Sequence, residues 1–355
     1  MPDRHGFTPS TGTTEHPPNT ERELDDVLST PRHTTIHALA RTPGDVMVLG
    51  AGGKMGPTLA CMTRRALDGA NDTRRVMAVS RFSSAPARRA LDDAGVETIS
   101  CDLLDRGAVA QLPDAPNVVF MAGQKFGTSD APSRTWMMNV VGPANCAERY
   151  AASRIVAFST GNVYPLVAVH QHGASEDDPT GPVGEYAASC VGRERVFEYY
   201  SATRGTKVAV VRLNYAIDLR YGVLTDLATK VLAGAPISLA MGHVNVIWQR
   251  DACAAALELL PLASSPPLVV NVTGAAVLAV RDLAHELGRR LGKAPVFEGH
   301  EANDALLSDT AKMRSLVASP EMTVATMLDW VAEWVRDGRP LLGKATHFET
   351  RDGAF

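Results

Sequence analysis

A glycine-rich turn between an apolar run and a helical pattern constrains the fold of this chain more than any other feature. Residues 46–49 form a short, continuous apolar run, and residues 57–67 repeat apolar side chains at helical spacing. Between them, Gly50, Gly53 and Gly56 have the spacing G-x-x-G-x-x-G, and Met55 stands where the commoner G-x-G-x-x-G form needs glycine. Such glycines let the backbone approach a pyrophosphate, which the free N–H groups of the helix N-terminus bind. The sequence therefore predicts a strand, turn and helix that bind a dinucleotide.

Apolar runs and helical patterns keep alternating as far as residue 213. Continuous apolar strands that alternate with helices are typical of a parallel sheet covered on both faces. We therefore predict an α/β fold, a Rossmann-like doubly wound parallel sheet with a smaller C-terminal substrate-binding region. The further strands are expected at residues 76–79, 98–100, 118–121, 155–158, 208–213 and 269–272, and the helices at 85–94, 133–152 (interrupted at most by Pro143), 186–203, 251–260, 280–291 and 322–335.

The predicted domain organisation has four parts. Residues 1–44 are an N-terminal extension, disordered to about residue 20 and helical over 21–28, so that the ordered core begins near Asp45. Residues 45–213 are the NAD(P)-binding Rossmann domain. Residues 214–340 are a mixed substrate-binding region, some of whose segments return to the Rossmann sheet. Residues 341–355 are a tail that is too polar to be core, and we expect it to fold over the site or a partner.

Composition limits the classes of function. The net charge of -4 and the pI near 6.2 give no indication of nucleic-acid binding. No apolar run approaches the roughly 20 residues that a membrane helix needs, and the polar N-terminus does not resemble a signal peptide. The five cysteines have no Cys-x-x-Cys pair, which argues against a metal site and favours reduced thiols in a cytoplasmic protein: Cys61, Cys101, Cys146, Cys190 and Cys253.

The end of the second expected strand bears on the choice of cofactor. NAD-specific sites usually place a carboxylate there, which binds the ribose 2′-hydroxyl. This chain has Ser80 and Arg81 instead, a hydroxyl and a guanidinium that suit a 2′-phosphate. The sequence therefore favours NADP over NAD.

Several further motifs follow in a fixed order: Asp102 and Leu103 after the third strand, Ala122-Gly123 closing the fourth, Asn139-Val-Val-Gly-Pro-Ala-Asn145, Ser159-Thr160-Gly-Asn162-Val-Tyr164, Ser175-Glu-Asp-Asp-Pro179, Tyr186-Ala-Ala-Ser189, Arg212-Leu-Asn214 and Asp251. With the glycine turn, these motifs resemble those of the extended short-chain dehydrogenase/reductase family, the NAD-dependent epimerase/dehydratase group. The resemblance covers roughly residues 45–335.

The resemblance implies roles for individual residues. Tyr186 takes the place of the family's catalytic base, and Thr160 that of the hydroxyl that binds the same substrate oxygen. The family usually forms dimers through the helices that correspond to residues 133–152 and 186–203, so a homodimer is expected. The residues expected to bind the cofactor are Gly50, Gly52, Gly53, Lys54, Met55, Gly56, Ser80, Arg81, Asp102, Leu103, Ala122, Gly123, Asn139 and Asn214.

Cys190 departs from the family pattern, because the family places a lysine four residues after the tyrosine. A tyrosine, with an ordinary pKa near 10, needs a nearby cation to act as a base at neutral pH, and a neutral thiol supplies none. Three explanations remain open. Arg193 or Lys125 replaces the cation; the chemistry starts elsewhere on the substrate, with Tyr186 only a hydrogen-bond donor; or the protein binds NADP without turnover.

The sequence predicts an NAD(P)-dependent oxidoreductase or epimerase that acts on a hydroxyl or carbonyl of a small sugar, sugar acid or similar polyol. The alternative is a catalytically silent NADP-binding sensor or regulator of the same fold. Gly161 and Asn162 replace the Asp-Glu pair of sugar-nucleotide 4,6-dehydratases, which disfavours that reaction. The residues expected to face the substrate are Lys125, Asn162, Tyr164, Arg193, Asn214, Arg220, Tyr221, His243, Asn245, Trp248 and Gln249.

Overall fold

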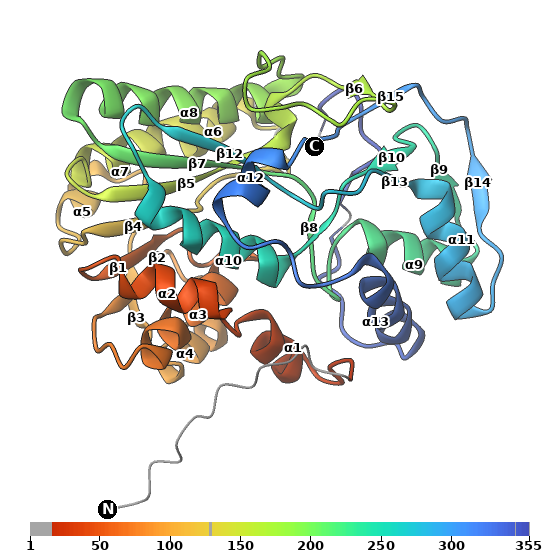
Figure 1. Ribbon diagram of the computed structural model, residues 1–355, viewed down its shortest axis with the longest axis horizontal. Helices are drawn as coiled ribbons and strands as arrows, with labels where there is room; N and C mark the ends of the chain where they lie inside the picture. Colours follow the sequence, from red (N-terminus) through yellow and green to blue (C-terminus); the bar gives the residue numbers. More distant parts are fainter. Residues whose placement is uncertain (1–15, 128–129, 345, 355) are drawn as a thin grey trace, which may run out of the picture.

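A seven-stranded parallel sheet forms the larger part of the protein (Figure 1). The computed structural model describes residues 16–127, 130–344 and 346–354, so the disorder expected for residues 1–15 lies outside the described residues. The strand order is β12-β7-β5-β4-β1-β2-β3, which confirms the predicted doubly wound fold. The strands are β1 (Val46–Leu49), β2 (Val76–Ser80), β3 (Glu97–Ser100), β4 (Asn117–Phe120), β5 (Arg154–Thr160), β7 (Lys207–Leu213) and β12 (Leu268–Val272).

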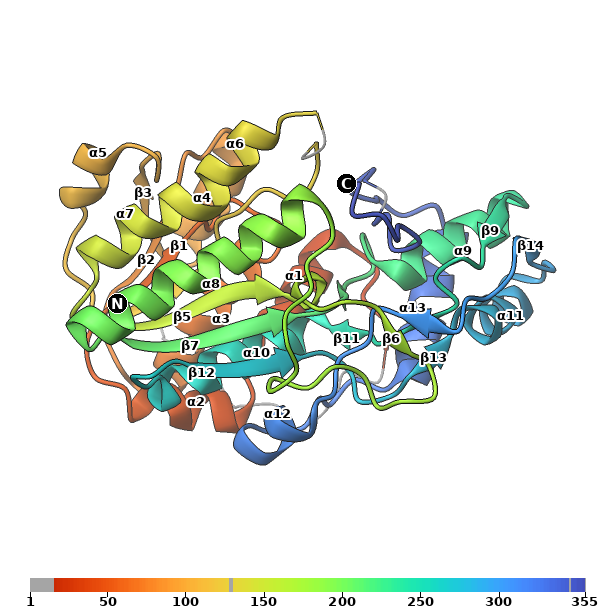
Figure 2. The same cartoon turned by 90° about the horizontal axis from the view of Figure 1, so that it is seen from above.

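Helices cover both faces of this sheet, because successive apolar side chains of a strand point to opposite faces. Val48 of β1 packs with α2 (His33–Ala40), α3 (Gly56–Gly69) and α10 (Gln249–Leu259). Met47 and Leu49 pack on the other face with α5 (Arg106–Ala110), α7 (Gly142–Arg149) and α8 (Gly184–Arg204). Figure 2 shows α7 and α8 running along one side of the sheet. Helix α4 (Ala85–Asp93) lies beside the edge strand β3.

The strand order reverses direction between β1 and β4. The chain runs outwards from β1 to β2 and β3, then crosses back to β4 and continues outwards through β5, β7 and β12. Ligands of open α/β sheets bind at this switch point, outside the carboxyl ends of the strands. The glycine turn follows β1 and the segment from Met121 follows β4, so both lie at the switch point.

The expected helix over 133–152 is interrupted by an irregular turn that ends two residues before Pro143. It comprises α6 (Pro132–Trp136), a π-helical turn (Met137–Val141) and α7. Pro143 follows the π-helical turn after Gly142, whose N–H donates to the Met137 carbonyl five residues back. Asn139 lies in this irregular turn, and π-helical turns are frequent at functional sites.

The ordered core begins earlier than the expected Asp45. Helix α1 (Glu21–Leu28) was expected, and α2 was not. Leu24 and Leu28 of α1 are fully buried in the core of the C-terminal region, and Leu39 of α2 is buried in the core of the sheet. The buried Arg32 between the two helices lies 3.2 Å from a carboxylate oxygen of Glu258 in α10. Both helices are therefore part of the folded core.

A second hydrophobic core lies beside the carboxyl edge of the sheet, on the right in Figure 1. Its main helices are α9 (Val223–Ala233), α11 (Val280–Leu291) and α13 (Val324–Arg336), with the short α12 (Ala311–Leu316) nearer the sheet. Short paired strands complete this region: β6 (Val167–Ala168), β8 (Ala216–Ile217), β9 (Pro236–Ser238), β10 (His243–Val244), β11 (Ile247–Trp248), β13 (Leu278–Ala279), β14 (Val296–Glu298) and β15 (Asp304–Ala305).

The C-terminal tail contributes to this second core, although its polarity predicted otherwise. Phe348 is 2% exposed and packs with the buried residues of α9 and α13. Thr346 donates hydrogen bonds to Asp226 from its backbone N–H and its hydroxyl, at 2.8 and 2.6 Å. One aromatic side chain and one buried polar contact therefore hold a segment that is otherwise polar. Within the described part of the chain, no helix is both long and apolar enough to cross a membrane.

Candidate active site

The glycine turn fits closely against the end of β4. Gly50 has a φ of +91°, and a Cβ atom on it would lie 2.4 Å from the backbone nitrogen of Ala122. A Cβ on Gly56 would lie 2.4 Å from the carbonyl oxygen of Ala51. Glycine is therefore required at both positions, and the turn leaves Gly52 and Gly53 exposed at the start of α3. This cradle fits the pyrophosphate of a dinucleotide.

The adenosine end of this site lies along β2 and β3. Ser80 ends β2 and is half-buried, and Arg81 follows it on the surface. Asp102 accepts a hydrogen bond from the backbone N–H of Leu104 at 3.0 Å, and Leu103 is buried. The structure thus places the residues predicted for the adenosine at neighbouring strand ends.

A buried network around Asn139 forms a floor beneath Gly123. Oδ1 of Asn139 accepts from the backbone N–H of Gln124 at 2.8 Å, and its Nδ2 donates to the Gln124 carbonyl and to the Ser189 hydroxyl, both at 2.9 Å. Nη2 of Arg193 also donates to Asn139 Oδ1 at 2.8 Å. A Cβ on Gly123 would lie 2.4 Å from that Nη2 atom, so the guanidinium lies directly against Gly123.

Arg193 is a buried cation that binds neutral acceptors. Its side chain contacts the Phe158 carbonyl at 2.8 Å and both oxygens of Asn139. The neighbouring carboxylate of Glu194 is bound by Arg212 at 2.7 and 3.0 Å. The charge of Arg193 is therefore not cancelled by Glu194. The structure places Arg193 beneath the floor, where its field acts on the site, and not on the wall of the substrate cleft.

Tyr186 and Thr160 come together where the start of α8 meets the end of β5. A side-chain hydrogen bond joins them, and Asn162 Nδ2 donates to Thr160 Oγ1 at 3.0 Å. Burial and the neighbouring Cys190 raise the pKa of Tyr186, while Arg193 and the Thr160 hydrogen bond act to lower it. Because burial is the largest effect, the hydroxyl keeps its proton at neutral pH.

Cys190 is fully buried beneath Tyr186, in a small cluster with Val163, Tyr164 and Ala174. Burial raises the pKa of its thiol, which outweighs the opposing field of Arg193. The thiol therefore remains protonated and adds no negative charge to the site.

A cleft of about 740 Å³, partly open to solvent, lies in front of Tyr186 and Thr160. One wall comes from the Rossmann domain and includes Lys54 and Lys125. The other comes from the C-terminal region and the tail, including Thr346. The further predicted residues in this cleft are Met55, Asn162, Asn214, Tyr221 and Gln249. Sequence reasoning missed Tyr215 and Thr346, because no local motif marks them.

Four other predicted substrate residues have structural partners outside this cleft. Arg220 binds Asp218 and Asp25, at 3.0 and 2.9 Å. Trp248 is buried against Trp330, with ring centroids 6.1 Å apart. Asn245 is buried; its Nδ2 donates to the Ala276 carbonyl and its Oδ1 accepts from the Ser308 N–H. The half-buried His243 lies in β10, paired with β13.

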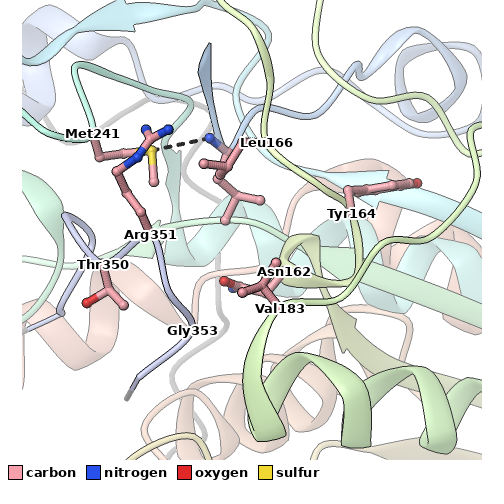
Figure 3. A pocket seen from close by; sticks show the side chains of 9 residues that line it. Asn162, Tyr164, Leu166, Val183, Met241, Thr350, Arg351 and Gly353 are labelled. Atoms are coloured by element: carbon pink, nitrogen blue, oxygen red, sulfur yellow. Dashed lines mark hydrogen bonds between the residues drawn. The ribbon is translucent and has the colours of Figure 1, made fainter. Parts of the chain in front are cut away.

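A second hollow of about 340 Å³ lies beyond Asn162, which also lines the cleft. Figure 3 shows Thr350, Arg351 and Gly353 of the tail on one side of it, with Asn162 and Tyr164 on the other. The Tyr164 hydroxyl, which was expected to face the substrate, is instead engaged inside the protein, where it donates to Asn271 and accepts from Arg212. The tail thus lies beside the cleft, which is one of the two placements that we expected for it.

A doubly wound parallel sheet with a glycine cradle at its switch point, and a tyrosine and threonine beside it, defines a class of nicotinamide-dependent enzymes of Rossmann fold. The chain belongs to the NAD dependent epimerase/dehydratase family, whose model matches residues 46–259. It is accordingly an NAD-dependent enzyme of the extended short-chain dehydrogenase/reductase type.

Solved structures of epimerases share this fold. A UDP-glucose 4-epimerase from Thermotoga maritima, determined with UDP-glucose, is 18% identical with a TM-score of 0.68, covering 83% of this chain and 99% of that one. A UDP-glucose 4-epimerase from Thermus thermophilus, determined with NAD, is 21% identical with a TM-score of 0.67, covering 81% and 98%. A putative epimerase from Burkholderia cenocepacia is 21% identical with a TM-score of 0.67, covering 84% and 99%. A search of curated protein sequences finds no match.

Proposed function

We propose that this protein is an oxidoreductase or epimerase that transfers a hydride between a nicotinamide cofactor and a hydroxyl or carbonyl carbon of a sugar, sugar acid or similar polyol. The observation that carries the proposal is the hydrogen-bonded pair of Tyr186 and Thr160 on the wall of a cleft, directly beside the floor of Asn139 and Arg193. A hydroxyl pair that binds one substrate oxygen is what proton transfer during hydride transfer requires.

The raised pKa of Tyr186 favours a role as proton donor in the resting enzyme. The bound nicotinamide supplies or accepts the hydride. As a substrate carbonyl is reduced, Tyr186 gives its proton to the carbonyl oxygen and becomes a phenolate. Thr160 stabilises that phenolate by its hydrogen bond, and Arg193 by its positive charge. In the reverse direction the same phenolate removes the proton of the substrate hydroxyl.

Arg193 therefore replaces the missing lysine in this proposal. It lies seven residues after Tyr186 on the same helix, it is buried, and it acts to lower the pKa of both Tyr186 and Cys190. A guanidinium stays protonated in a buried site, whereas a lysine there loses its charge more readily. The proposal therefore adopts the first of the three explanations for Cys190, in which another cation replaces the lysine.

We further propose that NADP is the preferred cofactor. Ser80 and Arg81 stand at the end of β2, and a hydroxyl and a guanidinium suit a 2′-phosphate better than a carboxylate does. The structure from Thermus thermophilus carries NAD, so this preference would separate the chain from that epimerase.

A small substrate fits better than a nucleotide sugar. The Thermotoga maritima structure contains UDP-glucose, whose diphosphate needs cations away from the reacting carbon. Arg220, the candidate for that contact, is engaged by Asp218 and Asp25. We therefore retain a sugar, sugar acid or polyol without a nucleotide.

A homodimer through the helices at residues 133–152 and 186–203, which are α6, the π-helical turn, α7 and α8, is also proposed. Trp136, Met137 and Val141 are exposed on the first two elements, and Tyr199 is 63% exposed on α8. Exposed apolar side chains gathered on adjoining helices favour an interface. Sedimentation velocity of wild type and of Met137→Glu tests it, with a dimer for the first and dissociation for the second; a wild-type monomer would refute it.

The main experiment compares Tyr186→Phe with wild type. A panel of aldoses, uronates, aldonates and polyols is screened with NAD and NADP, following nicotinamide absorbance. Loss of the proton donor should lower kcat by about a hundredfold or more, with an unchanged Kd for the cofactor. Tyr200→Phe on the same helix is the matched control and should retain activity. Equal activity of Tyr186→Phe would disprove the mechanism, and cofactor binding without turnover of any compound would favour the silent regulator.

A further inference from the structure

Two lysines from different segments face the same part of the cleft. Lys54 comes from the glycine turn and Lys125 from the segment after β4, and both line the cleft together with Tyr186 and Thr160. Nζ of Lys54 lies 5.1 Å and Nζ of Lys125 lies 5.7 Å from the centroid of the Phe126 ring. The two ammonium groups therefore lie against one aromatic side chain, at the edge of a space that a small molecule can enter.

This part of the cleft is positively charged. The described residues that line the cleft include the two lysines and neither aspartate nor glutamate. Lys344 of the tail adds a third positive charge close enough to act on Lys54. Of the two nearby carboxylates, Asp218 is bound by Arg220 and Asp226 accepts from Thr346. Two cations in a partly closed space, with an exposed third cation outside it that acts on Lys54, favour an anionic ligand.

The cation pair lies at the end of the site away from the adenosine, with Lys54 in the turn that also forms the pyrophosphate cradle. Nζ of Lys54 points to the C-terminal region, 2.9 Å from the centroid of the Tyr221 ring. Nζ of Lys125 lies 5.9 Å from the centroid of the Tyr186 ring. The residues at the ends of β2 and β3, where the adenosine is expected, do not line this cleft. An anion held by Lys125 would therefore lie within a few bonds of the carbon on which Tyr186 acts.

We propose that Lys54 and Lys125 bind a carboxylate of the substrate next to its reacting carbon, so that the substrate is a sugar acid, an aldonate or a uronate. This inference rests on the proposed function and adds the substrate class to it. A carboxylate so placed suits the geometry better than a nucleotide diphosphate, whose charges lie on the far side of the sugar. Charge-assisted hydrogen bonds from two ammonium groups also orient the substrate for hydride transfer.

The titration of the lysines agrees with this arrangement. Desolvation, with repulsion from Lys125 and Lys344, lowers the pKa of Lys54 to about 7. Desolvation lowers the pKa of Lys125 to about 8. Binding an anion would restore the proton to both groups, because an opposite charge favours the charged form.

The test uses the full-length protein loaded with its cofactor and two matched pairs of probes, D-glucuronate with D-glucose and D-gluconate with D-glucitol. Binding is measured by calorimetry and turnover by nicotinamide absorbance. We expect the acids to bind about tenfold more tightly than their neutral partners or better, since a charge-assisted hydrogen bond is worth that much. Lys54→Met and Lys125→Met should each remove about tenfold of the affinity for the acids, a larger loss than either change causes for the neutral sugars, and Lys125→Met should leave the affinity for the cofactor within about twofold.

Lys207→Met is the matched control, because Lys207 is exposed at the opposite end of the sheet, where β7 begins. The inference would be overturned if the acids bound no better than the neutral sugars, or bound equally well to the lysine variants. In that case, turnover of neutral sugars would still leave the proposed function intact. If glucose-6-phosphate alone shows the lysine dependence, the carboxylate assignment is wrong. Lysine-dependent binding of acids without any turnover would support the anion site and contradict the proposed function.

Discussion

Nη2 of Arg193 donates a hydrogen bond to Oδ1 of Asn139 over 2.8 Å. This contact joins the helix of Tyr186 to the π-helical turn beneath the cofactor floor. It also fixes a positive charge at a site from which the family's usual lysine is missing. The cation missing at Cys190 is thus matched by the guanidinium of Arg193, which lies one helical turn further along α8.

Replacing Arg193 by methionine should make Tyr186 a weaker acid. Arg193 acts to lower the pKa of Tyr186, so its removal raises that pKa. Alcohol oxidation needs the phenolate, and the rising limb of its kcat profile therefore moves to higher pH. We expect a displacement of about one pH unit or more in the kcat profile. Arg193→Lys should keep part of the effect.

If Arg193 had only a structural role, Arg193→Met would lower the stability of the protein without moving the pH profile of kcat. The lost hydrogen bonds to Asn139 and Phe158 cost about 1–3 kcal/mol each, so thermal unfolding is measured in parallel. Arg195→Met removes an exposed arginine of the same helix and is the control. An unchanged kcat profile in folded Arg193→Met would contradict the prediction.

Restoring the family lysine by Cys190→Lys should not restore activity. Cys190 is fully buried, and Arg193 lies three residues further along the helix. The larger side chain overpacks the cluster, at about 1–3 kcal/mol, and its charge repels that of Arg193. We expect a lower Tm and a kcat no higher than wild type. Adding Arg193→Met should recover part of both, and a large rise in kcat from the single change would show that the site is only weakened.

Ser80→Asp should turn the cofactor preference towards NAD. A carboxylate at the end of β2 repels a 2′-phosphate and accepts a hydrogen bond from a ribose 2′-hydroxyl. The affinity for NADP should fall about tenfold or more, and that for NAD should hold or rise. Fluorescence titration with the reduced cofactors measures both. Ser315→Asp, at an exposed position of α12, is the control; a wild-type preference for NAD would refute the proposal before any substitution.

The affinity for sugar acids should fall as the pH rises. Lys54 has a pKa of about 7 and Lys125 a pKa of about 8, so the positive charge is nearly complete one unit below the lower value and is lost as the pH rises through the two values. Lys344 adds repulsion that lowers the pKa of Lys54, and Asp218 and Asp226 act to raise it. Calorimetric Kd values between about pH 6 and about pH 9 measure the effect. Neutral sugars should show no such dependence, and Lys54→Met should abolish the first fall.

The strands and the order of the motifs were predictable because each depends on neighbouring residues. Periodicity over a few residues placed all seven strands of the sheet, and the glycine spacing placed the turn at the switch point. Helix α2 was missed, since its buried face becomes evident only when Leu39 meets the sheet. The tail was judged from its polarity, but Phe348 packs into the core and Thr346 binds Asp226, contacts that the local sequence does not reveal.

The sequence by itself determined the class of fold and the dinucleotide cradle, and its motifs, by their resemblance to the family, singled out Tyr186, Thr160 and the cysteine that replaces a lysine at position 190. These follow from local spacing, which the chain keeps wherever it folds. Only the tertiary structure decided the part each cation takes. Arg193 lies under the floor, Lys125 faces the cleft, and Arg220 is held by Asp218 and Asp25. Such roles depend on contacts between segments far apart in the chain, and charges act over a few ångströms of space whatever their separation in sequence.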